Sequence, residues 1–357
     1  MNVATKFLVL KFFNSLIFIS TIVLCLIFIL NLTSELDFFK DIKENSYLPI
    51  YFSLLNAPSM VFEMFPFIFL LSTQLFFLTI FKENQIDIFK YSGFKNDKII
   101  KIISIFSIIL GIVIIVFFYS ISSNLKKLYL NLKSNYTDDD KYLAVITKNG
   151  LWIKDLVDEK ILIINSSKIE HNIITEVFIS EFDKDYNIIR NIKSPRVNIE
   201  KNNWKIYQAS IFQKNNKEEK DILEIYSNFN YKRIQSLFSN LSSLSINELF
   251  GLRKNYKLLR YSTIEVDIQI IKILTYPIYL LLMVNLASII MLNFKSVQSN
   301  TFKISLGIFV SVIIFYFNNF FIILGKIEKI PYFISIIAPI IILFSIILLM
   351  LRNINEK

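Results

Sequence analysis

Cysteine and histidine are almost absent from this 357-residue sequence, since each occurs once, as Cys25 and His171. A single cysteine cannot form an internal disulfide, and one cysteine with one histidine leaves no ligand set for a zinc site. The sequence has no G-x-x-x-x-G-K-[ST] phosphate loop, so the chain does not hydrolyse ATP by the Walker mechanism. With one histidine a Ser/His/Asp triad is not plausible either. We therefore predict no catalytic site, no metal site and no cofactor.

Glycine and proline are scarce as well, with 6 and 7 residues, whereas 54% of the sequence is hydrophobic. The apolar residues gather in six runs, each long enough to cross a hydrocarbon core of about 30 Å at about 1.5 Å per residue. The expected spans are Phe12–Leu32, Pro58–Phe81, Ile99–Ile121, Ile268–Leu292, Lys303–Leu324 and Pro331–Leu351. The first run is longer than the apolar part of a signal peptide, so we interpret it as an uncleaved span.

The net charge of +10 does not indicate nucleic-acid binding, because no Lys/Arg block with interleaved aromatic residues occurs. Basic residues in the short loops instead predict the orientation, since they are in excess on the cytoplasmic side. One set of loops holds Lys6, Lys11, Lys82, Lys90, Lys95, Lys98, Lys101, Lys295, Lys303, Arg352 and Lys357. The opposite set holds only Lys40, Lys43, Lys326 and Lys329. We expect an inner-membrane protein with both termini in the cytoplasm.

Between the third and fourth spans, the apolar runs become short and rich in Ile, Val, Phe and Tyr, with polar turns between them. The expected strands are Tyr142–Ile146, Leu151–Ile153, Lys160–Ile164, Ile173–Phe182, Asn187–Ile192, Trp204–Phe212 and Ile222–Tyr226. This pattern predicts a sandwich, a jelly roll or an open barrel. Ser245 and Glu248 have the spacing of a capping box, so a helix over 245–261 is expected to lead into the fourth span.

The predicted organisation is three spans in residues 1–121, a periplasmic β domain in 122–262 and three more spans in 263–357. The fold class is therefore an α-helical membrane protein, six helices in a three-plus-three arrangement, with an inserted all-β, jellyroll-like domain. The acidic run Asp138–Asp140 is interpreted as a solvated turn rather than a metal site.

Ionisable residues at membrane depth are costly and usually face a bundle interior or a water-filled cavity. Glu63 and Lys272 are two such residues, and one interpretation is that they line the path of a polar or charged substrate. The other is structural, with side chains that reach the interface or an interhelical pair such as Glu265 with Lys272. For Asn318 and Asn319 we favour interhelical hydrogen bonds.

The loop 82–98, on the expected cytoplasmic side, is the best candidate for a partner contact. Ile86, Ile88 and Phe89 give it an apolar face, and a short amphipathic helix ending near Gly93 fits the sequence. The structural alternative is a plain turn. A helix that lies outside the membrane and shows Ile and Phe usually docks on a partner.

Several short segments occur together in an order that is typical of one family. They are Ala57-Pro58, Phe65-Pro66, Lys90-Tyr91-Ser92-Gly93-Phe94, Gly150-Leu151-Trp152-Ile153-Lys154-Asp155, Asn203-Trp204-Lys205, Lys272 with Pro277, and Pro331 with Pro339. In this order and on this layout, the chain resembles the LptF/LptG permeases of the lipopolysaccharide exporter over nearly its whole length. The segment 150–155 is more similar to LptG than to LptF.

This resemblance implies partners and a mechanism. Such permeases pair as an LptF–LptG heterodimer on two copies of the ATPase LptB, and the single-span protein LptC joins them. Lipopolysaccharide enters the cavity between the two subunits from the outer leaflet, and ATP-driven closure moves it onto a β-jellyroll bridge across the periplasm. Residues 139–226 match the place of the jellyroll domain, and residues 82–93 match the helix that couples to the ATPase.

Two regions depart from the family pattern. The coupling helix of the family usually has a glutamate eight residues before this glycine, where this chain has Gln85, with Glu83 two residues earlier. The contact with the ATPase is then a neutral hydrogen bond or is shifted, and Glu83, Gln85, Ile88, Phe89 and Gly93 are the coupling candidates.

The second departure is at the outer end of the first span, where the family tends to place lysines that meet lipid A phosphates. This chain has Asn31, Glu35 and Asp37 there. Because phosphates favour cations, Lys40 and Lys43 are the substitutes, and the candidate substrate path is Lys40, Lys43, Glu63 and Lys272.

Three classes of function compete. The first is a permease subunit for a lipidic glycoconjugate, as LptG or as its paralogue LptF. The second is a mechanotransmitting permease of the macrolide-exporter or cell-division type, but such proteins typically have four spans rather than six. The third is an intramembrane enzyme, which would need clustered acids, histidines or cysteines near one interface; the sequence lacks such a cluster.

Overall fold

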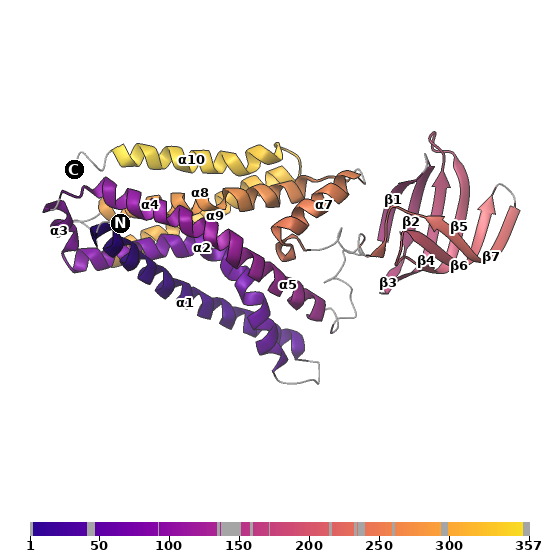
Figure 1. Ribbon diagram of the computed structural model, residues 1–357, viewed down its shortest axis with the longest axis horizontal. Helices are drawn as coiled ribbons and strands as arrows, with labels where there is room; N and C mark the ends of the chain where they lie inside the picture. The colour runs from indigo at the N-terminus through magenta and orange to yellow at the C-terminus, as the bar shows by residue number, and fades with distance from the viewer. Residues whose placement is uncertain are drawn as a thin grey trace. The chain divides into compact units, whose positions relative to one another are not determined.

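The computed structural model describes residues 3–40, 47–91, 93–133, 136, 151–157, 160–170, 172–213, 216–231, 234, 240–258, 261–293 and 299–352. The chain divides into two compact units, one of Met1–Tyr129 with Ile264–Lys357 and the other of Leu130–Thr263. The first unit is helical and the second carries the β-sheet (Figure 1). The expected strand Tyr142–Ile146, the run Asp138–Asp140 and His171 lie outside the described residues.

Six helical stretches within the described residues are long and apolar enough to cross a membrane, as the sequence predicts. They are α1 (Val3–Phe39), α2 (Leu48–Lys82), the continuous α4 (Asn96–Val113), η1 (Ile114–Tyr119) and α5 (Ser120–Lys133), then α8 (Ile264–Asn293), α9 (Asn300–Lys326) and α10 (Tyr332–Arg352). Three of them, α1, α2 and the stretch from α4 to α5, extend well beyond the predicted apolar runs, because hydropathy marks only the part that matches the hydrocarbon core. Helices α8 and α2 are the most buried of the six, and α9 is the least buried.

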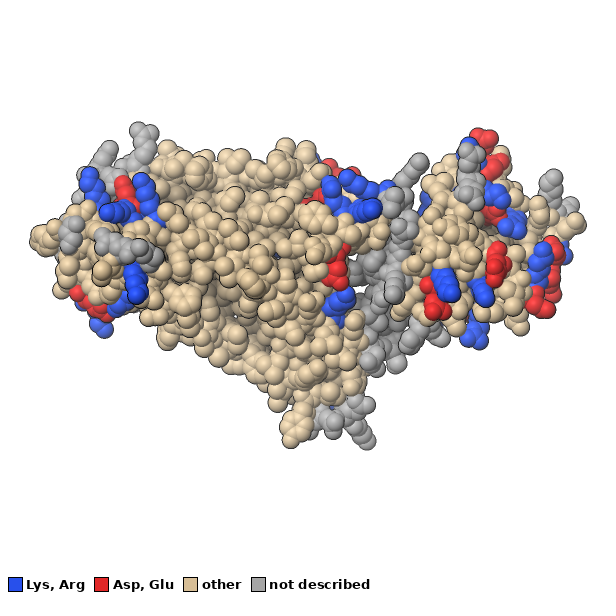
Figure 2. All heavy atoms as spheres, in the orientation of Figure 1, with Lys and Arg blue, Asp and Glu red and all other residues tan. Residues whose placement is uncertain are grey.

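Charged side chains lie at the two ends of the helical unit. On the face that Figure 2 shows, the wide band between these ends carries no Lys, Arg, Asp or Glu. The short helix α3 (Gln85–Tyr91) lies at the same end of this unit as the start of α1 and the end of α10 (Figure 1). A band without charge between two charged ends is the surface that a bilayer requires, so this chain is a multi-pass membrane protein.

The second unit contains one antiparallel sheet. Its strands are β1 (Leu151–Val157), β2 (Lys160–Ser166), β3 (Lys168–Glu170), β4 (Ile173–Phe182), β5 (Ile188–Asn198), β6 (Asn203–Gln213) and β7 (Asn216–Tyr226). The order in the sheet is β1-β2-β4-β5-β6-β7, and β3 pairs with β4. Apart from β3, each strand pairs with the strand before it, so the chain runs back and forth as a meander. The prediction of a β domain between two sets of three spans is confirmed.

One face of the sheet holds the core of this unit. Trp204 is fully buried in it, and its indole Nε1 donates a hydrogen bond to the carbonyl of Phe229 at 2.7 Å. The buried carboxylate of Asp155 on β1 accepts hydrogen bonds from the hydroxyl of Ser227 at 2.7 Å and from the backbone N–H of Asn228 at 2.9 Å. The segment that follows β7 is thereby fastened to β1, at the opposite edge of the sheet.

A buried ion cluster ties three strands together. Glu181 on β4 is 3% exposed, and it accepts hydrogen bonds from Lys160 on β2 at 2.7 Å and from Arg190 on β5. Burial by itself would raise the pKa of Glu181, but the hydrogen bonds from Lys160 and Arg190 outweigh it and hold the pKa below its ordinary value. The carboxylate is therefore stabilised in its charged form.

Helix α7 (Ile246–Leu258) follows in the same unit, and its N-terminus forms the predicted capping box. The carboxylate of Glu248 accepts hydrogen bonds from the backbone N–H of Ser245 at 2.8 Å and from its hydroxyl at 2.9 Å. These contacts provide partners at the start of the helix, where backbone groups otherwise lack them.

Candidate functional site

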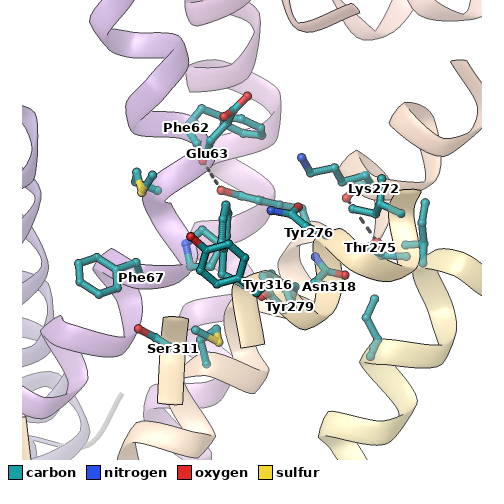
Figure 3. Close-up of a pocket in the computed structure, with 18 of the residues that line it drawn as sticks. Phe62, Glu63, Phe67, Lys272, Thr275, Tyr276, Tyr279, Ser311, Tyr316 and Asn318 are labelled. Atoms are coloured by element: carbon teal, nitrogen blue, oxygen red, sulfur yellow. Dashed lines mark hydrogen bonds between the residues drawn. The ribbon is translucent and has the colours of Figure 1, made fainter. Parts of the chain in front are cut away.

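A pocket of about 460 Å³ lies in the helical unit (Figure 3). It is bordered by α2, α8, α9 and α10, and its lining is mostly apolar and rich in aromatic rings. The polar and charged lining residues are Glu63, Lys272, Thr275, Tyr276, Tyr279, Ser311, Tyr316, Asn318 and Asn319. Pockets that bind small molecules usually combine apolar walls with a few polar groups in this way.

One wall of the pocket is a proline bend in α2. Pro66 has no N–H to donate, so the carbonyl of Phe62, four residues earlier, lacks its usual helical partner. The hydroxyl of Tyr276 on α8 donates a hydrogen bond to this carbonyl. The ring of Tyr276 also stacks on that of Phe62, with centroids 4.7 Å apart, and the ring of Tyr119 lies on Phe62 with a centroid distance of 4.9 Å. Tyr276 therefore provides the partner that a carbonyl in the bilayer requires.

The pocket brings together the residues that the sequence singled out at membrane depth. Glu63 and Lys272 both line it, and no ion pair joins either of them to another described residue. Asn318 and Asn319 also line it, and their side chains make no hydrogen bond with another described residue, so the interhelical hydrogen bonds that we expected for them stay a prediction. Glu265 lies 3.9 Å from Lys326 on α9 instead of pairing with Lys272.

Lys40, one of the two cations that were expected to replace the lysines of the family, does not line this pocket. Lys40 is exposed in the turn after α1, and Lys43 lies outside the described residues. Neither Asn31 nor Glu35 faces outward, since they are 6% and 1% exposed. Tyr129 donates a hydrogen bond to Glu35 at 2.8 Å.

A polar network joins α1, α2 and α5 beside this end of α1. The amide of Asn31 donates to the carbonyl of Ser53 at 3.4 Å and accepts a hydrogen bond from Asn56 at 2.9 Å. Lys126 donates to the same Asn56 side chain and lies over the ring of Tyr129. A cation is therefore present in this region, but it comes from α5 rather than from α1.

Around α3, most of the coupling candidates contact the protein itself. Glu83 forms an ion pair with Lys11 on α1 at 2.9 Å, and the amide of Gln85 donates a hydrogen bond to Glu83. The ring of Phe89 packs against Phe7, with centroids 6.1 Å apart. These contacts fix α3 to the ends of α1 and α2.

Two other described side chains of α3 are exposed. Ile88 is 62% exposed and Tyr91 is 92% exposed. Gly93 follows with a φ of +78°, a left-handed conformation that favours glycine and ends the helix. Nothing in the sequence selects Tyr91, because a tyrosine beside a lysine fits either a buried or an exposed position.

Six apolar helices, with a β-sheet inserted in the sequence between the third and the fourth, define a multi-pass membrane protein, and its helical unit contains a mainly apolar pocket. The model of the family described as lipopolysaccharide export system permease LptF/LptG matches residues 6–353 of this chain. The chain therefore belongs to the LptF/LptG family of transport permeases. No curated protein matches the sequence.

Proposed function

We propose that this chain is a transmembrane permease subunit of an ATP-driven lipopolysaccharide exporter, of the LptG type, with LptF as the alternative. The proposal rests on one observation, the family match over residues 6–353 on a chain with six apolar helices and an inserted β domain. In this function the chain lies in the inner membrane, with both termini in the cytoplasm and the sheet in the periplasm. It extracts lipopolysaccharide and passes it to a periplasmic jellyroll bridge.

The proposed partners are an LptF-like permease as the second subunit, an LptB-like ATPase dimer and an LptC-like single-span protein. ATP hydrolysis belongs to the ATPase, because the chain has no phosphate loop. Helix α3 is the proposed contact with the ATPase, through Ile88 and Tyr91, since Glu83 already pairs with Lys11. Lys40, Lys43, Glu63 and Lys272 remain the proposed substrate path.

Depletion of the protein tests the export function. We expect lipopolysaccharide to decrease at the cell surface and to accumulate in the inner membrane. Unchanged surface lipopolysaccharide would contradict export and would favour a mechanotransmitting permease. Rescue by a chain that carries Glu63→Ala and Lys272→Ala together then tests the substrate path, with Ile341→Ala on α10 as the control, because Ile341 is 56% exposed and does not line the pocket.

Co-purification tests the coupling helix. Ile88→Asp places a charge on the exposed apolar surface of α3, so we expect the amount of ATPase that purifies with the tagged, gently solubilised protein to fall at least about tenfold. Ile222→Asp is the matched control, because Ile222 on β7 is 57% exposed. Equal recovery of the ATPase with both variants would show that α3 is not the contact.

A further inference from the structure

Helix α9 forms the outer wall of the pocket, and it approaches its neighbours closely at two glycines. At Gly307, a Cβ atom would overlap the side-chain amide of Gln74 on α2, and this amide donates a hydrogen bond to the carbonyl of Lys303 at 2.9 Å. At Gly325, a Cβ atom would overlap the hydroxyl of Ser335 on α10. The two glycines are 18 residues apart, which is about 27 Å along a helix. This span is close to the thickness of a hydrocarbon core of about 30 Å.

Between these two contacts, α9 turns one face to the pocket. Ser311, Phe315, Asn318 and Ile322 recur at helical spacing, and all of them line the cavity. Phe315 is 47% exposed and Tyr316 is 68% exposed, so the pocket reaches the outer surface of the helical unit. In a membrane this surface is in contact with lipid. An acyl chain therefore has an apolar space to enter without crossing water.

The pocket also contains a cation without a counter-ion. Lys272 extends beside Tyr276 in Figure 3, and no described carboxylate forms an ion pair with it. Lys272 lies on α8 eight residues after Ile264, about 12 Å along the helix. A charge near the hydrocarbon boundary is costly unless an anion or water accompanies it, and a flexible lysine can extend toward the headgroup region. A lipid phosphate meets both needs, since it is an anion that lysine binds well and that carries an acyl chain with it.

We propose that the pocket between α9 and the pair α2 and α8 holds one acyl chain of a phosphate-bearing lipid, whose phosphate lies at Lys272. The site is within a single copy of this chain and does not need a second subunit to form. Both lipopolysaccharide and phospholipids supply this chemistry. If the lipid is lipopolysaccharide, the inference rests on the proposed function; if it is a phospholipid, it does not.

Photocrosslinking from two phenylalanines of α9 tests the site. Phe315 lines the pocket, whereas Phe317 does not line it, is 39% exposed and lies two residues later, on the opposite face of the helix. The full-length protein, with a benzophenone side chain at one of the two positions, is purified in detergent micelles doped with lipopolysaccharide, phosphatidylglycerol or diacylglycerol. The protein is washed with detergent and then irradiated, and we expect lipid adducts at Phe315 but little adduct at Phe317.

Variants of Lys272 test the role of the charge. Lys272→Gln is expected to lower the adduct of a phosphate-bearing lipid at Phe315 by about tenfold or more, as the loss of a hydrogen bond to a charged group would. Lys272→Arg is expected to retain the adduct, and diacylglycerol to give little adduct with any variant. Equal thermal melting of the three proteins establishes that the substitutions leave the fold intact.

Each result has a defined meaning. Preference for lipopolysaccharide identifies the exported lipid as the occupant, and equal labelling by phosphatidylglycerol identifies a phospholipid. The proposal is overturned if irradiation after the wash gives no more adduct at Phe315 than at Phe317, or if Lys272→Gln leaves the Phe315 adduct unchanged. The export function fails separately, by unchanged surface lipopolysaccharide on depletion, whatever lipid is found in the pocket.

Discussion

Removal of one hydroxyl group, by Tyr276→Phe, should weaken the helical unit measurably. Pro66 leaves the carbonyl of Phe62 without its helical donor, and the Tyr276 hydroxyl takes that place. Phenylalanine keeps the ring that stacks on Phe62 at 4.7 Å, so the substitution removes the hydrogen bond and little else. Because Tyr276 is 4% exposed, no water is at hand to replace the lost donor.

The expected decrease in the free energy of unfolding equals the cost of an unpaired buried carbonyl. This cost is about 1–3 kcal/mol, or roughly a 5- to 150-fold change in the unfolding equilibrium. The measurement is the free energy of unfolding of the full-length protein in mixed detergent and dodecyl sulfate micelles. Both tryptophans, Trp152 and Trp204, are in the β-sheet unit, so the helical circular dichroism signal is the appropriate probe.

Two further variants test whether the Tyr276 hydroxyl acts by replacing the missing N–H of Pro66. The hydroxyl of Tyr279 makes no hydrogen bond with any described residue, so Tyr279→Phe should cost only a few tenths of a kcal/mol as the matched control. In a Pro66→Ala background the restored N–H can donate to Phe62, and Tyr276→Phe should then cost much less. An equal loss in the two backgrounds would refute the claim that Tyr276 acts by replacing the donor that proline lacks.

Two predictions concern the β-sheet unit. Asp155→Asn removes the charge that accepts the hydrogen bonds of the segment after β7, so the free energy of unfolding of the sheet should fall by about 1.5–3 kcal/mol. The backbone amide hydrogen of Asn228 should then exchange about tenfold faster or more, as measured by hydrogen exchange and mass spectrometry. The pKa of Glu181 is lower in the folded state than in the unfolded state, so its stabilising effect is complete above pH about 4.5 and is lost as the pH falls through the folded pKa. Acid unfolding of the sheet, followed by tryptophan fluorescence, should show this dependence in the native protein but not in Glu181→Gln.

The apolar helices were predictable because their signal is local. Each run, such as Phe12–Leu32, exceeds the length that a bilayer requires, and no tertiary contact is needed to recognise it. The ends of the helices were less predictable, since α1 continues to Phe39 through polar residues that are buried against α2 and α5. The β-strands followed from alternation, but their order in the sheet depends on pairings between distant segments that no short window contains.

The pocket was predictable only in part. Charge at membrane depth was sufficient to select Glu63 and Lys272, because such residues are costly wherever they lie. The proline at position 66 predicts that the carbonyl of Phe62, four residues earlier, lacks its helical donor. Tyr276 was still not selected, because nothing in the sequence says which neighbouring helix supplies the hydroxyl. Asn318 was assigned to interhelical hydrogen bonding, since sequence alone does not show which face of α9 meets another helix.

The size of the pocket argues that one copy of this chain is an incomplete path for lipopolysaccharide. A cavity of about 460 Å³ is in the range of 300–1,000 Å³ that suits a drug-sized ligand, whereas lipopolysaccharide carries several acyl chains and a large sugar portion. The chain can therefore enclose a part of such a lipid but not the whole. Helices α9 and α1 are the least buried of the six, so they offer the surfaces on which a second permease subunit would complete the enclosure. On this reasoning, variants of Lys272 should alter which lipid is held, whereas bulky polar substitutions on the exposed face of α9, such as Ile313→Gln, should weaken the association of the two subunits.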